Sequence, residues 1–109
     1  MRWPGAEEVD RAVRRWARSL AEERREIQSV GYFGSYATGL WGVGSDCDIV
    51  VILQRSEEPF EKRARFLRPE SLPVPADVLV YTAEEWEKVK RTGFGKTVCS
   101  EMVWVFRRV

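Results

Sequence analysis

The stretch 45-SDCDIVVIL-53 sets two carboxylates one residue apart at the head of an apolar run. The uninterrupted apolar residues 49–53 are typical of a buried strand. Because residues i and i+2 of an extended segment share a face, Asp46 and Asp48 are expected to point the same way from the start of that strand. Two such carboxylates repel each other unless a cation lies between them. The stretch therefore predicts a strand with a candidate cation site at its beginning.

Length and charge limit the class of protein. The chain has 109 residues, with 18 basic against 17 acidic side chains, so we expect one domain, residues 1–109. A near-neutral balance argues against a surface that holds nucleic acid by counterion release, and no direct nucleic acid binding is expected. No apolar stretch is long enough to span a membrane, and the charged start lacks the apolar region of a signal peptide. These features predict a soluble, cytoplasmic protein.

The residue types that are absent narrow the chemistry. The sequence contains no histidine, which excludes Ser-His-Asp and Cys-His nucleophile schemes and the usual zinc sites. Cys47 and Cys99 have neither the spacing of a zinc knuckle nor the number of a disulfide framework, so both are expected to be reduced. Any catalysis must rest on carboxylates, hydroxyls and arginine.

The first half of the chain predicts one helix and two strands. Apolar residues recur at four- and three-residue steps in an amphipathic helix expected over 6–24. The segment 27–33 has the pattern of a strand that stops at Gly34. A glycine-rich stretch, 34–45, then leads into the strand 46–53.

The middle of the chain predicts two helices around a third strand. The run 56–59 favours the beginning of a helix that ends at Pro69. Asp77 heads a third apolar run, 78–81. Thr82 and Glu85 then match a capping box, which predicts a helix that ends near Gly93.

The end of the chain completes the predicted fold. Residues 94–101 are a candidate helix and residues 103–106 a candidate strand. The order of elements predicts an α/β (α+β) domain, with a small mixed β-sheet flanked by helices.

Three acidic residues and one turn are expected to meet in this fold. Asp46, Asp48 and Asp77 stand at the starts of strands, and the Gly34-Ser35 turn stands at the end of another. Hard divalent cations such as Mg²⁺ bind through a few carboxylates together with substrate phosphates. Gly34 lets the backbone approach a phosphate closely, and Ser35 offers its hydroxyl and amide. The grouping predicts a metal and nucleotide site.

Each of these residues also has a structural interpretation. Gly34 and Ser35 are common in ordinary turns, Asp48 could pair with an arginine, and Asp77 could be a loop acid. If all three acids were only structural, however, their like-charge repulsion would be a cost that no bound cation offsets.

The remaining aromatic and basic residues are assigned by their surroundings. Trp16 and Trp86 have the helical spacing of core residues. Trp41, between glycines, is expected to be exposed, where it could contact a nucleotide base or a partner or simply pack on the loop. A solvated helix face is the interpretation for Arg14, Arg15 and Arg18, with Arg24 and Arg25, and binding of an acidic acceptor is the alternative. Arg107 and Arg108 are interpreted as a soluble tail.

Over roughly residues 9–106 the chain resembles the minimal nucleotidyltransferases (MNT proteins) of the polymerase beta nucleotidyltransferase superfamily. The resemblance is carried by Gly34-Ser35, ten residues, Asp46-Cys47-Asp48 and then Asp77, and by the surrounding segment 32–39. It implies the nucleotidyltransferase fold.

The resemblance also implies the activity: transfer of a nucleoside monophosphate, with AMP from ATP as the expected case, to an acceptor hydroxyl. Asp46, Asp48 and Asp77 would hold Mg²⁺ and act as the catalytic residues, with Asp77 also accepting the acceptor's proton. Gly34, Ser35 and Thr38 would hold the triphosphate. Thr38 stands where many such proteins carry an arginine, and it offers only a hydroxyl.

The resemblance further implies a partner, because minimal nucleotidyltransferases pair with small helical HEPN proteins in toxin–antitoxin systems. Three hypotheses follow. The first is an adenylyltransferase acting on a tyrosine of a HEPN partner. The second is an antitoxin that binds by occlusion with an idle site, which Thr38 favours. The third is a nucleotidyltransferase for a small molecule, such as an aminoglycoside-like hydroxyl compound, that works as a homodimer.

Overall fold

The computed structural model describes residues 2–108, apart from the side chain of Phe66. The strands are β1 (Ile27–Phe33), β2 (Cys47–Leu53), β3 (Ala76–Thr82) and β4 (Val103–Arg107). The helices are α1 (Ala6–Glu23), α2 (Ser35–Thr38), α3 (Phe60–Arg63), the 3-10 turn η1 (Ala64–Phe66), α4 (Ala83–Val89) and α5 (Gly93–Glu101).

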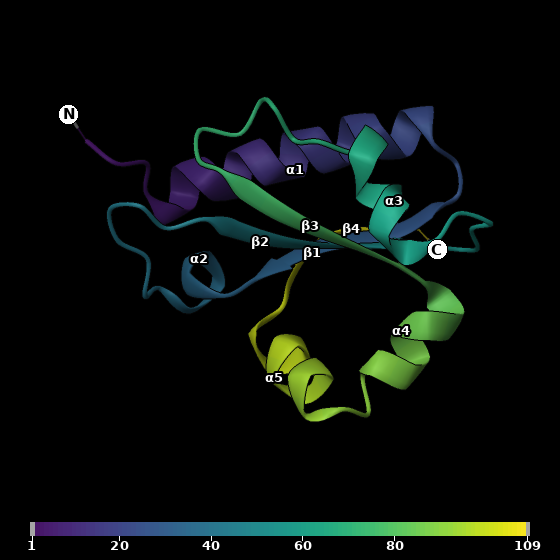
Figure 1. Cartoon of the computed structure of the whole chain (residues 1–109). Coiled ribbons are helices and arrows are strands. Elements are labelled where there is room, and N and C mark those ends of the chain that lie inside the picture. The colour runs from purple at the N-terminus through teal and green to yellow at the C-terminus, as the bar shows by residue number, and fades with distance from the viewer. Residues whose placement is uncertain (1, 109) are drawn as a thin grey trace.

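The strands form one mixed sheet in the order β3-β2-β1-β4. Strand β1 is antiparallel to both β2 and β4, whereas β2 and β3 are parallel. Helix α1 lies along one face of this sheet, and α4 and α5 lie on the opposite side (Figure 1). A small mixed sheet flanked by helices is the α/β (α+β) class that the sequence predicts.

The larger hydrophobic core lies between α1 and the sheet. Its helical side is a stripe at three- and four-residue spacing, which includes the fully buried Val9, Val13 and Ala17. Ile49 and Val51 of β2 belong to the same cluster. Burial of this stripe explains why α1 forms, since most helical stability in proteins comes from packing an amphipathic face.

A smaller core lies on the other face of the sheet. Val50 and Ile52, which alternate with the residues of the larger core along β2, pack there with Trp86 of α4 and Val98 of α5. The predicted core role of Trp86 is confirmed, since its side chain is 6 % exposed. Trp16 is half-buried against the larger core.

The segment after β2 differs from the sequence prediction. In place of one helix from 56–59 to Pro69, the chain forms α3 and then tightens into η1. Arg63, at the junction, is a buried charged residue, with 8 % of its surface exposed. Its guanidinium donates to the Glu58 carbonyl at 2.9 Å and to the Val80 carbonyl at 3.2 Å. These inward contacts fix the junction against β3.

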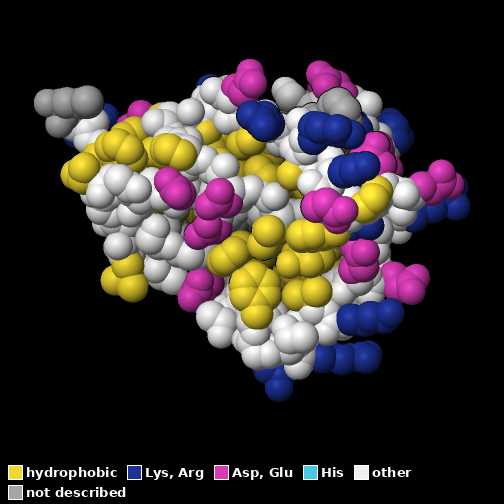
Figure 2. Space-filling view, in the orientation of Figure 1, with side chains coloured by type: hydrophobic (Ala, Val, Ile, Leu, Met, Phe, Trp, Pro, Cys, Tyr) yellow, Lys and Arg dark blue, Asp and Glu magenta, His cyan; other side chains and the backbone are white. Residues whose placement is uncertain are grey.

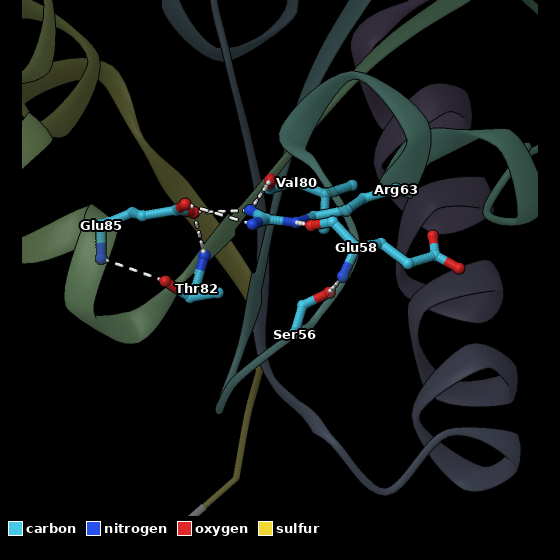
Figure 3. A network of polar contacts seen from close by, with 6 residues as sticks. All are labelled: Ser56, Glu58, Arg63, Val80, Thr82 and Glu85. Atoms are coloured by element: carbon cyan, nitrogen blue, oxygen red, sulfur yellow. Dashed lines mark hydrogen bonds and ion pairs between the residues drawn. The ribbon is translucent and has the colours of Figure 1, made fainter.

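Arg63 also joins the beginning of α4 (Figure 3). Its guanidinium donates to both carboxylate oxygens of Glu85. The predicted capping box is confirmed: the Thr82 hydroxyl accepts the Glu85 amide at 3.1 Å, and the Glu85 carboxylate accepts the Thr82 amide at 2.8 Å. The network links α3, β3 and α4.

The predicted soluble tail is wrong. The Arg108 guanidinium donates to the carbonyls of Ile27 and Ala21, at 2.9 and 2.8 Å, and so ties the end of the chain to α1 and β1. The Arg107 guanidinium lies 4.7 Å from the centre of the Trp104 ring. Both cysteines are free, as predicted. Within residues 2–108, no helix has the length and apolar character that crossing a membrane requires.

Candidate active site

Asp48 and Asp77 lie side by side at the beginning of the parallel pair of strands. They are register partners in the β2–β3 ladder. Asp48 has the same strand parity as Val50 and Ile52, so it points to the face that carries α4 and α5. Residues in register on adjacent strands share a face. The structure therefore brings these two predicted site residues together.

Asp46 lies one residue before β2, which begins at Cys47 rather than at Asp46 as the sequence predicts. The Cys47 amide donates to the Pro75 carbonyl at 2.9 Å, and this bond holds the start of β2 beside the segment that precedes β3. The Cys47 side chain is buried on the α1 side. Burial, reinforced by Asp48, raises the pKa of this thiol to about 12.

Gly34 approaches Asp48 from the end of β1. Its backbone has φ +82°, a region that disfavours other residues. A Cβ at this position would overlap the Oδ2 atom of Asp48. Phe33, the preceding residue, is the register partner of Asp48 in the β1–β2 pair. A side chain at position 34 would therefore be strained by the backbone conformation and would displace the Asp48 carboxylate.

Ser35 begins the short helix α2, which the N-terminal segment fixes in place. The hydroxyl of Tyr36 accepts from the Trp3 indole at 2.9 Å and donates to the Pro4 carbonyl at 3.0 Å. Trp41 stacks on the Tyr36 ring, with ring centres 5.7 Å apart. The expectation that Trp41 is exposed is wrong: it is half-buried and packs on the loop, because Tyr36 offers it a flat apolar face.

Thr38 is exposed at the end of α2. The next residue, Gly39, adopts a left-handed conformation with φ +85° and terminates the helix. Thr38 is therefore on the same short helix as Ser35 but at its far end.

Glu101 is a fourth acid at this site, and no sequence pattern indicates it. It is the last residue of α5, and its Oε1 atom accepts the Gly34 amide at 3.0 Å. Its position in the sequence is 67 residues from Gly34. No local spacing pattern relates residues so far apart, so only the folded chain reveals the contact.

The acids repel one another electrostatically. Burial raises the pKa of Asp48, and the charges of Asp77, Asp46 and Glu101 raise it further, in that order. On the side of the molecule that Figure 2 shows, acidic side chains gather beside an apolar area. The site is thus an acidic end of the sheet with a tight glycine turn.

The metal expectation can be tested against this arrangement. In residues 2–108, no three His, Cys, Asp or Glu side chains are gathered closely enough to hold a metal ion as the chain stands. The donor chemistry nevertheless fits a hard divalent cation, because the groups are carboxylates.

A pocket of about 710 Å³ opens beside Asp77. Arg65 and Arg68 contribute to its wall, together with residues of the segment that leads into β3. It borders the acidic end of the sheet and is large enough for a small molecule or a few side chains of a partner.

Comparisons with known proteins identify the family and support the fold. The chain matches the nucleotidyltransferase domain family over residues 13–101. Its fold is similar to that of a proposed nucleotidyltransferase from Sulfolobus solfataricus, with a TM-score of 0.69, 19 % identity, and coverage of 94 % of this chain and 84 % of that chain.

A second similar structure is described as a toxin–antitoxin with AMP-PNP. The TM-score is 0.54, the identity is 16 %, and the likeness covers 87 % of this chain and 73 % of that chain. A comparison with curated proteins gives no match. Because the family match spans most of the chain, this protein belongs to the nucleotidyltransferase domain family and is a nucleotidyltransferase.

Proposed function

We propose that this nucleotidyltransferase acts in the cytoplasm as the antitoxin of a toxin–antitoxin pair, and that it uses Mg²⁺ to transfer AMP from ATP to a tyrosine hydroxyl of a helical HEPN partner. The observation that carries the proposal is the register pairing of Asp48 with Asp77 beside the Gly34 turn. Adjacent carboxylates next to a side-chain-free turn suit a substrate made of a metal ion and a triphosphate.

In this proposal the carboxylates of Asp46, Asp48 and Asp77 hold the metal. When bound, Mg²⁺ would neutralise triphosphate charge and stabilise the attacking and departing oxygens. The glycine–serine turn brings its backbone close to the phosphates, and the hydroxyl and amide of Ser35 donate hydrogen bonds to them. Thr38, at the far end of the same helix, adds a hydroxyl.

The proposed transfer is a single displacement at the α-phosphorus. Asp77 accepts the proton of the acceptor hydroxyl, and the acceptor oxygen forms a bond to the α-phosphorus. The bond between that phosphorus and the oxygen bridging to the β-phosphate breaks, and pyrophosphate leaves. Asp77 suits the role of base because it is exposed on β3 and borders the 710 Å³ pocket.

Two observations support a protein as the acceptor. Leu40 and Val43, on the loop between α2 and Asp46, are 82 % and 88 % exposed. Large apolar side chains that are so exposed beside an active site favour contact with another protein. The similarity in fold to the structure described as a toxin–antitoxin with AMP-PNP supports the same partner class and an adenine nucleotide.

Incubation of the protein with Mg²⁺, ATP labelled on its α-phosphate, and the protein encoded next to it in the genome tests the proposal. We expect label on a tyrosine of the neighbour, and no label with the double variant Asp46→Asn and Asp48→Asn. A stable complex without label would instead support inhibition by occlusion, which Thr38 favours. Label on neither protein, with pyrophosphate released when aminoglycosides are supplied, would support a small-molecule acceptor.

A further inference from the structure

Helix α5 is fixed over the sheet at both of its ends. Near its beginning, the Phe94 ring meets the Phe33 ring edge to face, with centres 6.2 Å apart. At its end, the Glu101 carboxylate accepts the Gly34 amide at 3.0 Å. Phe33 and Gly34 are consecutive, so both contacts act on the point where β1 turns into α2. The helix is therefore a clamp on the glycine–serine turn.

The turn that this clamp holds is conformationally demanding. Gly34 combines φ +82° with ψ −153°. The carboxylate of Asp48 lies where a Cβ atom of residue 34 would be. A hydrogen bond from an amide to an ionised carboxylate is stronger than one to a neutral acceptor. Glu101 thus restrains the peptide group that directs Ser35.

The charge of Glu101 has an electrostatic cost. Together with Asp77 and Asp46, Glu101 raises the pKa of Asp48. A neutral amide at position 101 would satisfy the Gly34 amide without this repulsion.

We propose that Glu101 is a positioning residue for nucleotidyl transfer: by accepting the Gly34 amide it fixes the glycine–serine turn, and with it Ser35, in the orientation that binds the triphosphate of the nucleotide. This inference rests on the proposed function, because it takes the turn to be the triphosphate site. Glu101 acts through Gly34 and is not assigned to the reacting atoms.

The contact itself is tested without nucleotide. Hydrogen exchange of the Gly34 amide, followed by NMR on the full chain, should accelerate about tenfold in Glu101→Ala, where the acceptor is lost. In Glu101→Gln the side-chain carbonyl still accepts the amide, so the rate should stay within about threefold of wild type. Glu84→Ala, which removes an exposed glutamate from α4, is the matched control and should leave the Gly34 rate unchanged.

The positioning role is tested with ATP and Mg²⁺ by calorimetric titration. Glu101→Ala should raise the dissociation constant about tenfold, because a misplaced turn loses hydrogen bonds to the triphosphate. Glu101→Gln should restore most of the affinity. A merely structural role would lower the free energy of unfolding and leave the affinity of the folded protein unchanged.

The outcomes separate this inference from the proposed function. Wild-type protein that binds ATP and transfers nothing to the neighbouring protein defeats the proposed function and leaves the role of Glu101 standing. Glu101→Ala protein with wild-type Gly34 exchange, or with unchanged or tighter ATP binding, overturns the role of Glu101. A wild-type chain that does not bind ATP overturns both.

Discussion

Two acidic side chains on opposite faces of the sheet, Asp10 and Asp48, have opposite surroundings. On the α1 face, the Asp10 carboxylate accepts the Tyr32 hydroxyl at 2.7 Å and the Arg14 guanidinium at 2.8 Å. On the α5 face, Asp48 has acids for neighbours, and its pKa is raised by burial and by their charges. The charge of Asp10 is compensated by its two hydrogen-bond donors, whereas Asp48 is repelled by the negative charges of its acidic neighbours. The difference teaches that Asp10 helps to hold α1 against the sheet, whereas the acids around Asp48 are the ones that the proposed function assigns to a cation.

Strand β2 separates the two faces residue by residue. Ile49 and Val51 point into the larger core, and Asp48 and Val50 point to the other side. Because side chains alternate along a strand, a substitution can reach one face without disturbing the other. The comparison between the faces can therefore be tested with single substitutions.

The largest effect is expected from Asp48→Asn. Nucleotidyl transfer should fall about a thousandfold, since a group that stabilises the transition state electrostatically is lost. The free energy of unfolding without metal should rise or stay unchanged, because the substitution removes like-charge repulsion. Label transfer from ATP and urea denaturation measure the two quantities.

The control for this substitution is Glu22→Gln, the same change of acid to amide on the exposed side of α1. It should leave both quantities as in wild type. If Asp48→Asn instead lowers the free energy of unfolding, the acid is structural and the contrast between the faces is broken.

The next largest effect is expected on the opposite face, from Ile27→Ala. Ile27 is fully buried in the larger core. Its truncation should lower the free energy of unfolding by about 3 kcal/mol, through lost burial and the cavity that remains. Label transfer per folded molecule should not change, because Ile27 is at the far end of β1 from Gly34. A loss of transfer equal to that of Asp48→Asn would contradict this division.

The elements were predictable where the pattern is local. The bounds of β1, residues 27–33, follow from a short segment that contains Val30, Tyr32 and Phe33 and stops at Gly34. Helix α1 follows from the spacing of its buried stripe. The capping box at Thr82 and Glu85 involves residues three positions apart, and the structure contains it. Such features are decided by neighbours in the sequence.

The remainder depends on contacts between distant residues. The single helix predicted to end at Pro69 is split, because Arg63 turns inward to β3 and to Glu85. The end of the chain is ordered by contacts of Arg108 with α1 and β1. Glu101 joins the candidate site only because α5 folds back over β1. Patterns among neighbouring residues do not predict contacts between residues that are far apart in the sequence.

The pH dependence of the free energy of unfolding should distinguish Glu85, an acid paired with an arginine, from Asp48, an acid among like charges. The hydrogen bonds from Arg63 lower the pKa of Glu85 from 4.5 to about 2. A carboxyl group with a depressed pKa in the folded state stabilises the fold above its unfolded pKa, so its contribution should be complete above pH 4.5 and be lost as the pH falls toward 2. Urea denaturation at several pH values measures this loss.

The variant Glu85→Gln should be less stable than wild type at pH 7 and should show a flatter decline of stability below about pH 4.5. Glu84→Gln changes an exposed neighbour and should keep the wild-type slope. Equal slopes in wild type and Glu85→Gln would show that the Arg63 pair contributes nothing to folding.

The smallest effect is expected from Thr38→Arg, which adds a cation at the end of α2, the helix that follows the glycine–serine turn. Because Thr38 is exposed, a guanidinium there would interact with a bound triphosphate through water, and such exposed pairs contribute up to about 1 kcal/mol. We therefore expect ATP to bind about two- to fivefold more tightly in calorimetric titration, with the gain lost at high salt. Thr38→Gln, of similar length and no charge, is the control and should bind as wild type does. Weaker ATP binding by Thr38→Arg would mean that the triphosphate does not lie along α2, and would move the nucleotide to the pocket beside Asp77.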